Sequence, residues 1–243
     1  LNPGEMFSFL CHNRVSCFTH CCRELELALS PYDVLRLRLA TGLDSAELHE
    51  RYIIEELTPE DTFPRFFLTM VDDGKASCVF VNDAGCTIYP HRPGACRTYP
   101  LGRGTTREQG QVNEQFVLLR EPHCKGFQEK TVQTAKSFMN SQELAPFNLF
   151  NDRLTAITQH QRIKGGMRLS GTQLALYKLA LYDLDTFRAE LVSTDQESAV
   201  FLDEQTLDTA LSDDRNLLIA AMKWVGALLV TLSSENKKNE KQR

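Results

Sequence analysis

Residues 11–22 read CHNRVSCFTHCC and carry four thiols, at Cys11, Cys17, Cys21 and Cys22. All the other cysteines follow by residue 124, and the rest of the 243-residue chain contains none. Cysteines that served only as small buried side chains would be spread more evenly. The first half of the chain is therefore where we look for the function. The remaining cysteines are Cys78, Cys86, Cys96 and Cys124.

Three interpretations of the eight cysteines are open. They could be buried apolar side chains, which does not explain the adjacent pair Cys21 and Cys22. They could form four disulfides, but such scaffolds are typical of small secreted chains, and adjacent cysteines bridge each other only with strain. They could bind metal, because thiolates are soft ligands that suit zinc and iron–sulfur clusters. We favour metal, in two four-coordinate centres or in one larger cluster.

The spacing of the cysteines bears on the metal. Structural zinc sites typically show two short Cys-x2-Cys pairs. Here the gaps are irregular, from 0 to 55 intervening residues. Because the irons of a cluster spread their ligands further apart than one zinc ion does, we favour an iron–sulfur cluster. A four-iron cluster is the expected cofactor, and zinc is the alternative.

Basic and polar residues flank the cysteines. Metal centres made of thiolates carry negative charge, which nearby cations and N–H groups offset. We expect five side chains to surround the ligands: Arg23, Arg92, Arg97, Tyr99 and His123. Four histidines could also replace a thiolate as a nitrogen ligand, although hydrogen bonding within the loops is the interpretation we favour for each: His12, His20, His91 and His123.

Composition excludes several classes of protein. Apolar residues make up 42% and charged residues 24%, which is typical of a globular chain rather than a disordered one. The net charge of −5 argues against non-specific nucleic-acid binding. The most apolar stretch, 217–232, is interrupted by Lys223 and is shorter than the roughly 20 residues of a membrane span. The start of the chain shows no secretory signal. We expect no membrane and no nucleic-acid partner.

Local signals in the first half predict short helices and strands. Ser30-Pro31 predicts a helix start and Gly42 its end. Asp44 and Glu47 form a capping-box pattern that predicts a second helix through Ile54. Strands are predicted at 66–71 and 77–81 around a turn at 72–74, and a further strand at 112–119.

The second half reads as helical and shows no catalytic constellation. Helices are predicted at 131–140, 147–163, 172–192 and 213–232, and a frayed polar end at 233–243. This half is expected to act as a packing scaffold or as the surface for a protein partner. The predicted fold class is α+β. The predicted divisions are a cysteine-cluster domain at 1–128, a helical region at 129–234 and a polar tail at 235–243.

One long pattern runs through the cysteine-containing half. It begins as Phe9-x-Cys11-x5-Cys17-x3-Cys21-Cys22-Arg23, continues as Cys78-x7-Cys86-x-Ile88-Tyr89-x2-Arg92-Pro93-x2-Cys96-Arg97-x-Tyr99-Pro100, and ends at Cys124. Over about residues 7–127 this pattern resembles the YkgJ-like cysteine-cluster family, whose domain is described as zinc- or iron-chelating and sometimes as an Fe–S oxidoreductase.

The resemblance implies a bacterial or archaeal cytoplasmic protein that binds metal through all eight cysteines, with a redox or electron-transfer role. The spacing around Cys11 and Cys17 departs from the shorter Cys-x2-Cys-x2-Cys-Cys of many members. The resemblance implies no structure or function for the helical half, which lies outside the matched pattern.

A second function is an S-adenosylmethionine-dependent methyltransferase, because a flagellin lysine N-methylase family carries a similar cysteine cluster. Against it, the chain has no G-x-G-x-x-G loop after a strand, and the Cys-x3-Cys-x2-Cys spacing of radical S-adenosylmethionine enzymes is absent.

Overall fold

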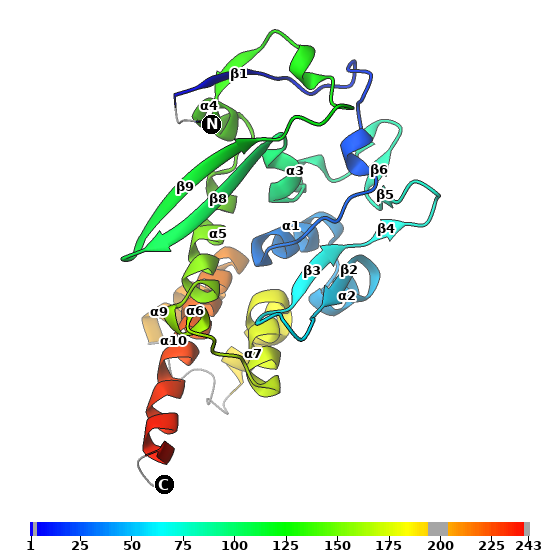
Figure 1. Ribbon diagram of the computed structural model, residues 1–243. Coiled ribbons are helices and arrows are strands. Elements are labelled where there is room, and N and C mark those ends of the chain that lie inside the picture. The colour runs from blue at the N-terminus through cyan, green and yellow to red at the C-terminus, as the bar shows by residue number, and fades with distance from the viewer. Residues whose placement is uncertain (2–3, 194–203, 241–243) are drawn as a thin grey trace.

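Short antiparallel strand pairs and a helical second half make up the computed structural model, which describes residues 1, 4–193 and 204–240 (Figure 1). The predicted α+β class is confirmed. The strand pairs are β1 (Met6–Ser8) with β10 (Val132–Thr134), β2 (Ile53–Glu56) with β3 (Arg65–Leu68), β4 (Met70–Val71) with β5 (Ser77–Cys78), β6 (Val81–Asn82) with β7 (Gly85–Cys86), and β8 (Leu101–Glu108) with β9 (Gln111–Leu118).

The helices are mostly in the second half. They are α1 (Pro31–Thr41), α2 (Ser45–Tyr52), α3 (Gly94–Thr98), α4 (Ala135–Ser141), α5 (Ala145–Thr158), α6 (Gln161–Lys164), α7 (Gly171–Tyr182), α8 (Leu184–Val192), α9 (Glu204–Ser212) and α10 (Asp214–Glu240). Of those in the second half, α7, α9 and α10 lie in the lower part of Figure 1 and α4 lies near the top beside β1. Three 3-10 turns are described as well: η1 (His20–Cys22), η2 (Tyr89–His91) and η3 (Gly126–Gln128).

The capping signals of α1 are confirmed. Ser30 is its N-cap, its hydroxyl accepts a hydrogen bond from Asp33 N, and the Asp33 carboxylate accepts one from Ser30 N. Gly42 ends the helix with a φ of 69°, which glycine adopts without a steric penalty.

The predicted second helix stops earlier than expected. Asp44 caps α2, but the helix ends at Tyr52 and Ile53 begins a strand. Two consecutive β-branched residues, Ile53 and Ile54, pair there with Leu68 and Phe67 of β3, and this pairing replaces the last helical turn.

One long strand, β8, was not predicted from the sequence. The turn at 72–74 and the strand near 112–119 are confirmed, whereas β8 was not predicted because it holds Gly102 and Gly104. Its partner β9 supplies the pairing. Gln109 and Gly110 join the two strands in a two-residue turn, with φ values of 49° and 84°.

The helical half differs in its boundaries. The predicted helix at 172–192 is broken at Asp183, whose side chain caps α8 by accepting from Thr186 N. The predicted helix at 147–163 is divided into α5 and α6, and residues 132–134 of the one at 131–140 form β10 instead. The last helix continues to Glu240 rather than fraying at 233, and residues 241–243 lie outside the described residues.

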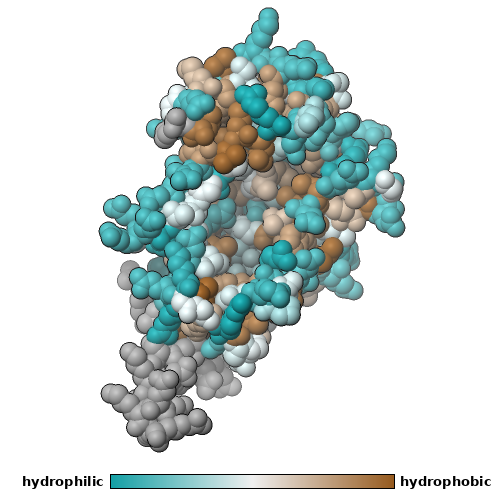
Figure 2. Space-filling model, viewed as in Figure 1, coloured by the Kyte–Doolittle hydropathy of each residue, from teal (hydrophilic) through white to brown (hydrophobic). Residues whose placement is uncertain are grey.

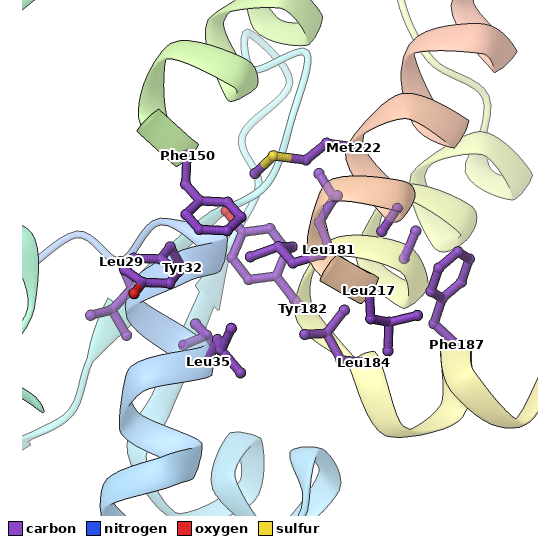
Figure 3. Packing of buried hydrophobic residues seen from close by; sticks show 14 of the residues in the cluster. Leu29, Tyr32, Leu35, Phe150, Leu181, Tyr182, Leu184, Phe187, Leu217 and Met222 are labelled. Atoms are coloured by element: carbon purple, nitrogen blue, oxygen red, sulfur yellow. The ribbon is translucent and has the colours of Figure 1, made fainter. Parts of the chain in front are cut away.

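The large hydrophobic core takes side chains from both halves of the chain. The Tyr32 ring of α1 stacks on Phe150 of α5 at 4.3 Å, and Phe66 of β3 stacks on Tyr182 of α7 at 3.7 Å. Figure 3 shows Tyr32 and Phe150 of this core together with Leu217 and neighbours from α7, α8 and α10. The core therefore crosses residue 128, and the predicted division there stays a prediction.

A smaller core supports the N-terminal strand. It contains Phe7 and Phe9 of the first segment, Leu101 and Phe116 of the β8–β9 ribbon, and Phe138 of α4. In the view of Figure 2, apolar residues gather in the upper part of the face and hydrophilic residues cover much of the rest. Among the described helices, none combines the length and the apolar character needed to cross a membrane.

A buried carboxylate connects α1 to the turn that carries Cys96. Asp33 is 5% exposed, and its Oδ1 accepts a hydrogen bond of 2.7 Å from Gly94 N at the start of α3. A Cβ at position 94 would lie 3.1 Å from the Phe147 ring, so glycine allows α3 to approach α5 closely. The core thus fixes the position of α3.

We expect Asp33→Ala to lower the free energy of unfolding by about 1–3 kcal/mol, because it leaves the buried Gly94 N–H without a partner. Chemical unfolding followed by the fluorescence of Trp224 measures this change. Hydrogen exchange at 94–98 should rise as well.

The matched control is Asp44→Ala, which removes the exposed cap of α2 and leaves α3 intact. It should leave hydrogen exchange at 94–98 unchanged. Equal exchange in the two variants would contradict the connection between α1 and α3.

Candidate metal centre

Two contacts bring the first cysteine segment to the last one. Leu10 N donates to Gly126 O at 3.1 Å, and Lys125 N donates to Cys17 Sγ at 3.1 Å. Leu10 and Lys125 are the chain neighbours of Cys11 and Cys124. These three cysteines therefore lie in one region although Cys17 and Cys124 are far apart in the sequence.

Other contacts bring the first segment to the middle one. Glu24 N donates to Ala76 O at 3.1 Å, and Arg23 forms a β-bridge with Ser77, which precedes Cys78. The ring of Phe18 lies against Gly85, where a Cβ would be 3.1 Å from Phe18 Cζ. Segments 17–24 and 76–86 are thus packed against each other.

The thiols are accessible and unpaired. All eight cysteines are free, so the disulfide interpretation is not what the structure shows. Cys11 and Cys21 are exposed as whole residues, although protein atoms surround their thiols enough to remove water from them, and the other six cysteines are partly buried. A cavity of about 330 Å³ opens beside Cys78, between Arg23 and the β4–β5 hairpin.

The environment of Cys11 opposes a bare thiolate. Burial and the neighbouring thiols Cys21, Cys17 and Cys124 raise its pKa to about 11. Other thiols raise the pKa of Cys11 in this way only when they lie near it. Their thiolate forms need a cation to offset the accumulated charge, and a bound metal ion supplies one.

Cys96 has a comparable environment in the middle segment. Burial raises its pKa, and Cys78, Cys21 and Cys86 raise it further. A hydrogen bond to Cys22, together with burial, raises the pKa of Cys21. Cys21 therefore acts on thiols of both regions.

Arg92 is an expected basic residue whose charge acts on two of the cysteines. Burial raises the pKa of Cys11 and of Cys86, and the charge of Arg92 lowers it in both. The guanidinium is held in place by hydrogen bonds to Tyr89 O at 2.8 Å and to Gln142 Oε1 at 2.7 Å. It also lies over the Tyr89 ring at 3.8 Å.

Arg97 and Arg23 support the backbone around the site. Arg97 is 3% exposed and donates to Pro90 O at 2.6 Å and to Gln142 O at 2.9 Å. Arg23 donates to the carbonyl oxygen of Thr19 at 2.8 Å and to its hydroxyl at 3.0 Å. Both side chains hold the loops that carry cysteines, and a direct contact with sulfur stays a prediction.

Tyr99 and His123 meet at one carboxylate beside Cys124. The Tyr99 hydroxyl donates to Glu121 Oε2 at 2.7 Å, and His123 Nε2 lies 3.5 Å from the same oxygen. Burial raises the pKa of Tyr99, as do its hydrogen bonds with Glu121 and Cys124. The rings of His20 and His123 are 6.1 Å apart.

The other two histidines have different surroundings. His12 Nε2 lies 3.6 Å from a carboxylate oxygen of Glu129, and its Nδ1 accepts from Arg14 N at 3.2 Å. Nδ1 of His91 is buried and has no partner in the part of the chain that the structure describes. Ligation by any histidine stays a prediction.

The residues fit a metal by their chemistry. Free thiols are the donors that zinc and iron–sulfur clusters take. Within the described ranges, however, no three side chains of His, Cys, Asp or Glu are already arranged to hold a metal ion.

Sequence reasoning did not find the glycines that allow these approaches. At Gly126 a Cβ would lie 2.5 Å from the Phe9 ring and 3.0 Å from Leu10 O, so this position must be glycine. Gly85 plays the same part toward Phe18. The only feature of the sequence that could have indicated these two positions is that each glycine lies within two residues of a cysteine. Asp33 and Glu121 were missed as well, because the partners that connect them to the site, Gly94 and Tyr99, are distant in the sequence.

A comparison with known families identifies residues 10–131 as a CxxCxxCC domain, described as a "putative zinc- or iron-chelating domain". The matched range contains all eight cysteines. No curated protein and no solved structure matches the chain. The methyltransferase alternative gains no support from these comparisons.

We expect Gly126→Ala to reduce stability by about 1–3 kcal/mol, because overpacking against the buried Phe9 ring must push the segment before Cys11 away. Thermal unfolding measures the loss. Alkylation of Cys17 should become faster, since Lys125 N would no longer be held against its sulfur.

Gly104→Ala is the matched control, because a Cβ there meets nothing within 4 Å. An equal loss of stability in both variants would show that the close approach at Gly126 does not matter.

Proposed function

The chain belongs to the family of zinc- or iron-chelating domains, and on that premise we propose that it holds iron in iron–sulfur form for redox or electron transfer. The proposed ligands are the eight cysteines Cys11, Cys17, Cys21, Cys22, Cys78, Cys86, Cys96 and Cys124. Metal binding is what the family supports, and the identity of the metal and the redox role are our proposal.

The observation that carries the proposal is the gathering of thiols. Thiols from three segments of the chain lie near enough to act on one another, because neighbouring thiols raise the pKa of Cys11 and of Cys96, after the larger effect of burial. A metal cation bound by these thiolates would offset the repulsion among their negative charges. Metal binding is therefore favourable.

Two features favour iron–sulfur chemistry over a single zinc ion. The adjacent pair Cys21 and Cys22 lies in a 3-10 turn, and a hydrogen bond joins the two side chains. Two adjacent thiolates can bind different metal atoms of one cluster. The exposure of Cys11 and Cys21 leaves the site near the surface, where an electron can pass to a partner.

The free thiols also support a location in the cytoplasm. That compartment keeps cysteines reduced, whereas eight neighbouring thiols would be oxidised in a secreted protein.

Purification without oxygen tests the metal. We expect a coloured protein that absorbs visible light and contains both iron and acid-labile sulfide, as thiolate-bound clusters do. Metal analysis and the visible spectrum are the measurements. A colourless protein with stoichiometric zinc and no sulfide would decide for zinc instead.

Removal of the metal should loosen the cysteine loops and leave the large core folded, because α1 and β3 pack against the helical half. We expect faster hydrogen exchange at 9–24, 76–98 and 120–131 after treatment with a chelator. The fluorescence of Trp224, which is 3% exposed in that core, should change little.

The chelated protein reloaded with metal is the control for irreversible damage. Unchanged exchange in the loops after complete metal removal would contradict the coupling between metal binding and folding.

A further inference from the structure

We propose that Gln142, which follows α4, is a positioning residue for the metal centre: it holds the Arg92 guanidinium beside the cysteine loops, where its positive charge favours metal-bound thiolates. This inference rests on the proposed function, because it concerns the same centre. Residue 142 lies outside the matched family domain, which ends at residue 131. The helical half of the chain therefore contributes to a centre whose ligands all lie in the first half.

Arg92 is a buried cation in the connection between Cys86 and Cys96, and 8% of its surface is exposed. Its Nη2 donates to Gln142 Oε1 at 2.7 Å, and its Nη1 donates to Tyr89 O at 2.8 Å. Tyr89 belongs to the same short loop as Arg92, whereas Gln142 is 50 residues further along the chain. The bond to Gln142 is therefore the one that fixes the guanidinium relative to the helical half.

The backbone of Gln142 is held separately from its side chain. Gln142 is the C-cap of α4, and carbonyl groups at a helix end have no partner within the helix. Its carbonyl oxygen accepts a hydrogen bond of 2.9 Å from Arg97 Nη1. Arg97 Nε donates in turn to Arg92 O at 3.2 Å, so the two arginines and residue 142 form one connected group. A change of the Gln142 side chain leaves the bond from Arg97 in place.

The small core gives this group a fixed support. Phe138 of α4 is 3% exposed, and its ring lies 5.9 Å from that of Phe7 and 6.0 Å from that of Phe9. Phe9 is two residues before Cys11. The helix that positions Arg92 is therefore packed against the strand that leads into the first cysteine segment.

The charge of Arg92 has no protein anion to compensate it. In the part of the chain that the structure describes, no carboxylate forms an ion pair with Arg92, whereas Arg97 has Glu143 Oε2 at 3.4 Å. A buried charge is unfavourable without such compensation. A guanidinium has five N–H groups, and the bonds to Gln142 and the loop use two of them. Metal-bound thiolates supply the negative charge that Arg92 lacks.

The effect of Arg92 on the thiols agrees with this placement. Burial raises the pKa of Cys11 and of Cys86, and the charge of Arg92 lowers it in both. A cation lowers the pKa of a thiol by favouring the thiolate, which is the form that binds metal. Loss of the cation from this position should therefore weaken metal binding.

Two substitutions at Gln142 separate the charge of Arg92 from the hydrogen bond that holds it. Gln142→Ala removes the acceptor. Gln142→Glu keeps an acceptor for Arg92 Nη2 but adds a negative charge beside it. We expect both variants to bind Zn²⁺ about tenfold more weakly than the wild-type chain, a loss typical of residues that orient or surround metal ligands. The dissociation constant is measured on the metal-free full chain by competition with a chromophoric chelator.

Asn140→Asp is the matched control, because it makes the same change from amide to carboxylate at an exposed position of α4 two residues away. It should bind Zn²⁺ as tightly as the wild-type chain. The fluorescence of Trp224 reports whether the large core is folded in each variant. Because Gln142→Glu retains the hydrogen bond, it tests the proposal even where Gln142→Ala unfolds.

Wild-type affinity in either folded Gln142 variant would overturn the positioning role, and so would an equal loss of affinity in Asn140→Asp. A wild-type chain that takes up neither Zn²⁺ in this titration nor iron during anaerobic purification would overturn the proposed function instead, and the role of Gln142 with it.

Discussion

The buried carboxylate of Asp33 is the interaction on which the arrangement of this protein depends. It accepts hydrogen bonds from Ser30 N and the Ser30 hydroxyl at the start of α1, and from Gly94 N at the start of α3. A buried carboxylate is tolerated only when donors satisfy it, so these bonds are required once Asp33 is buried. They connect a helix of the large core with the short helix that carries Cys96. The cysteine loops therefore attach to a rigid base.

If the cysteines in these loops ionise, their negative charges lie close together, and few nearby cations offset them. Among the described residues, Arg92 is the one arginine whose charge lowers the pKa of both Cys11 and Cys86. Arg97 and Arg23 are occupied with backbone carbonyl oxygens. The large core is made of apolar side chains from α1, β3 and the second half of the chain, whereas the cysteines lie in the loops and short elements attached to it. The residues that stabilise the fold and the candidate metal ligands are thus largely different residues.

Local signals predicted what depends on neighbouring residues. The start of α1 at Ser30, its end at Gly42 and the turn at 72–74 follow from caps and turn residues, and the structure has all three. Strand β8 and the break at Asp183 were missed. Gly102 and Gly104 have little preference for a strand, and β8 exists because β9 pairs with it. The helical pattern of 172–192 continues through Asp183, and the side-chain cap that begins a new helix there cannot be recognised from periodicity alone.

The sequence by itself determined the family and identified eight thiols as candidate metal ligands. Eight thiols in the first half, with the motif around Cys86 and Cys96, define a chelating domain whatever the details of its fold. Only the tertiary structure decided which thiols are neighbours. Cys17 meets the segment of Cys124 through a hydrogen bond from Lys125 N, and the close approach of Phe9 to Gly126 allows it. Contacts of this kind depend on packing between segments that are more than a hundred residues apart. Spacing along a chain says nothing about such packing, because the intervening residues can fold in many ways.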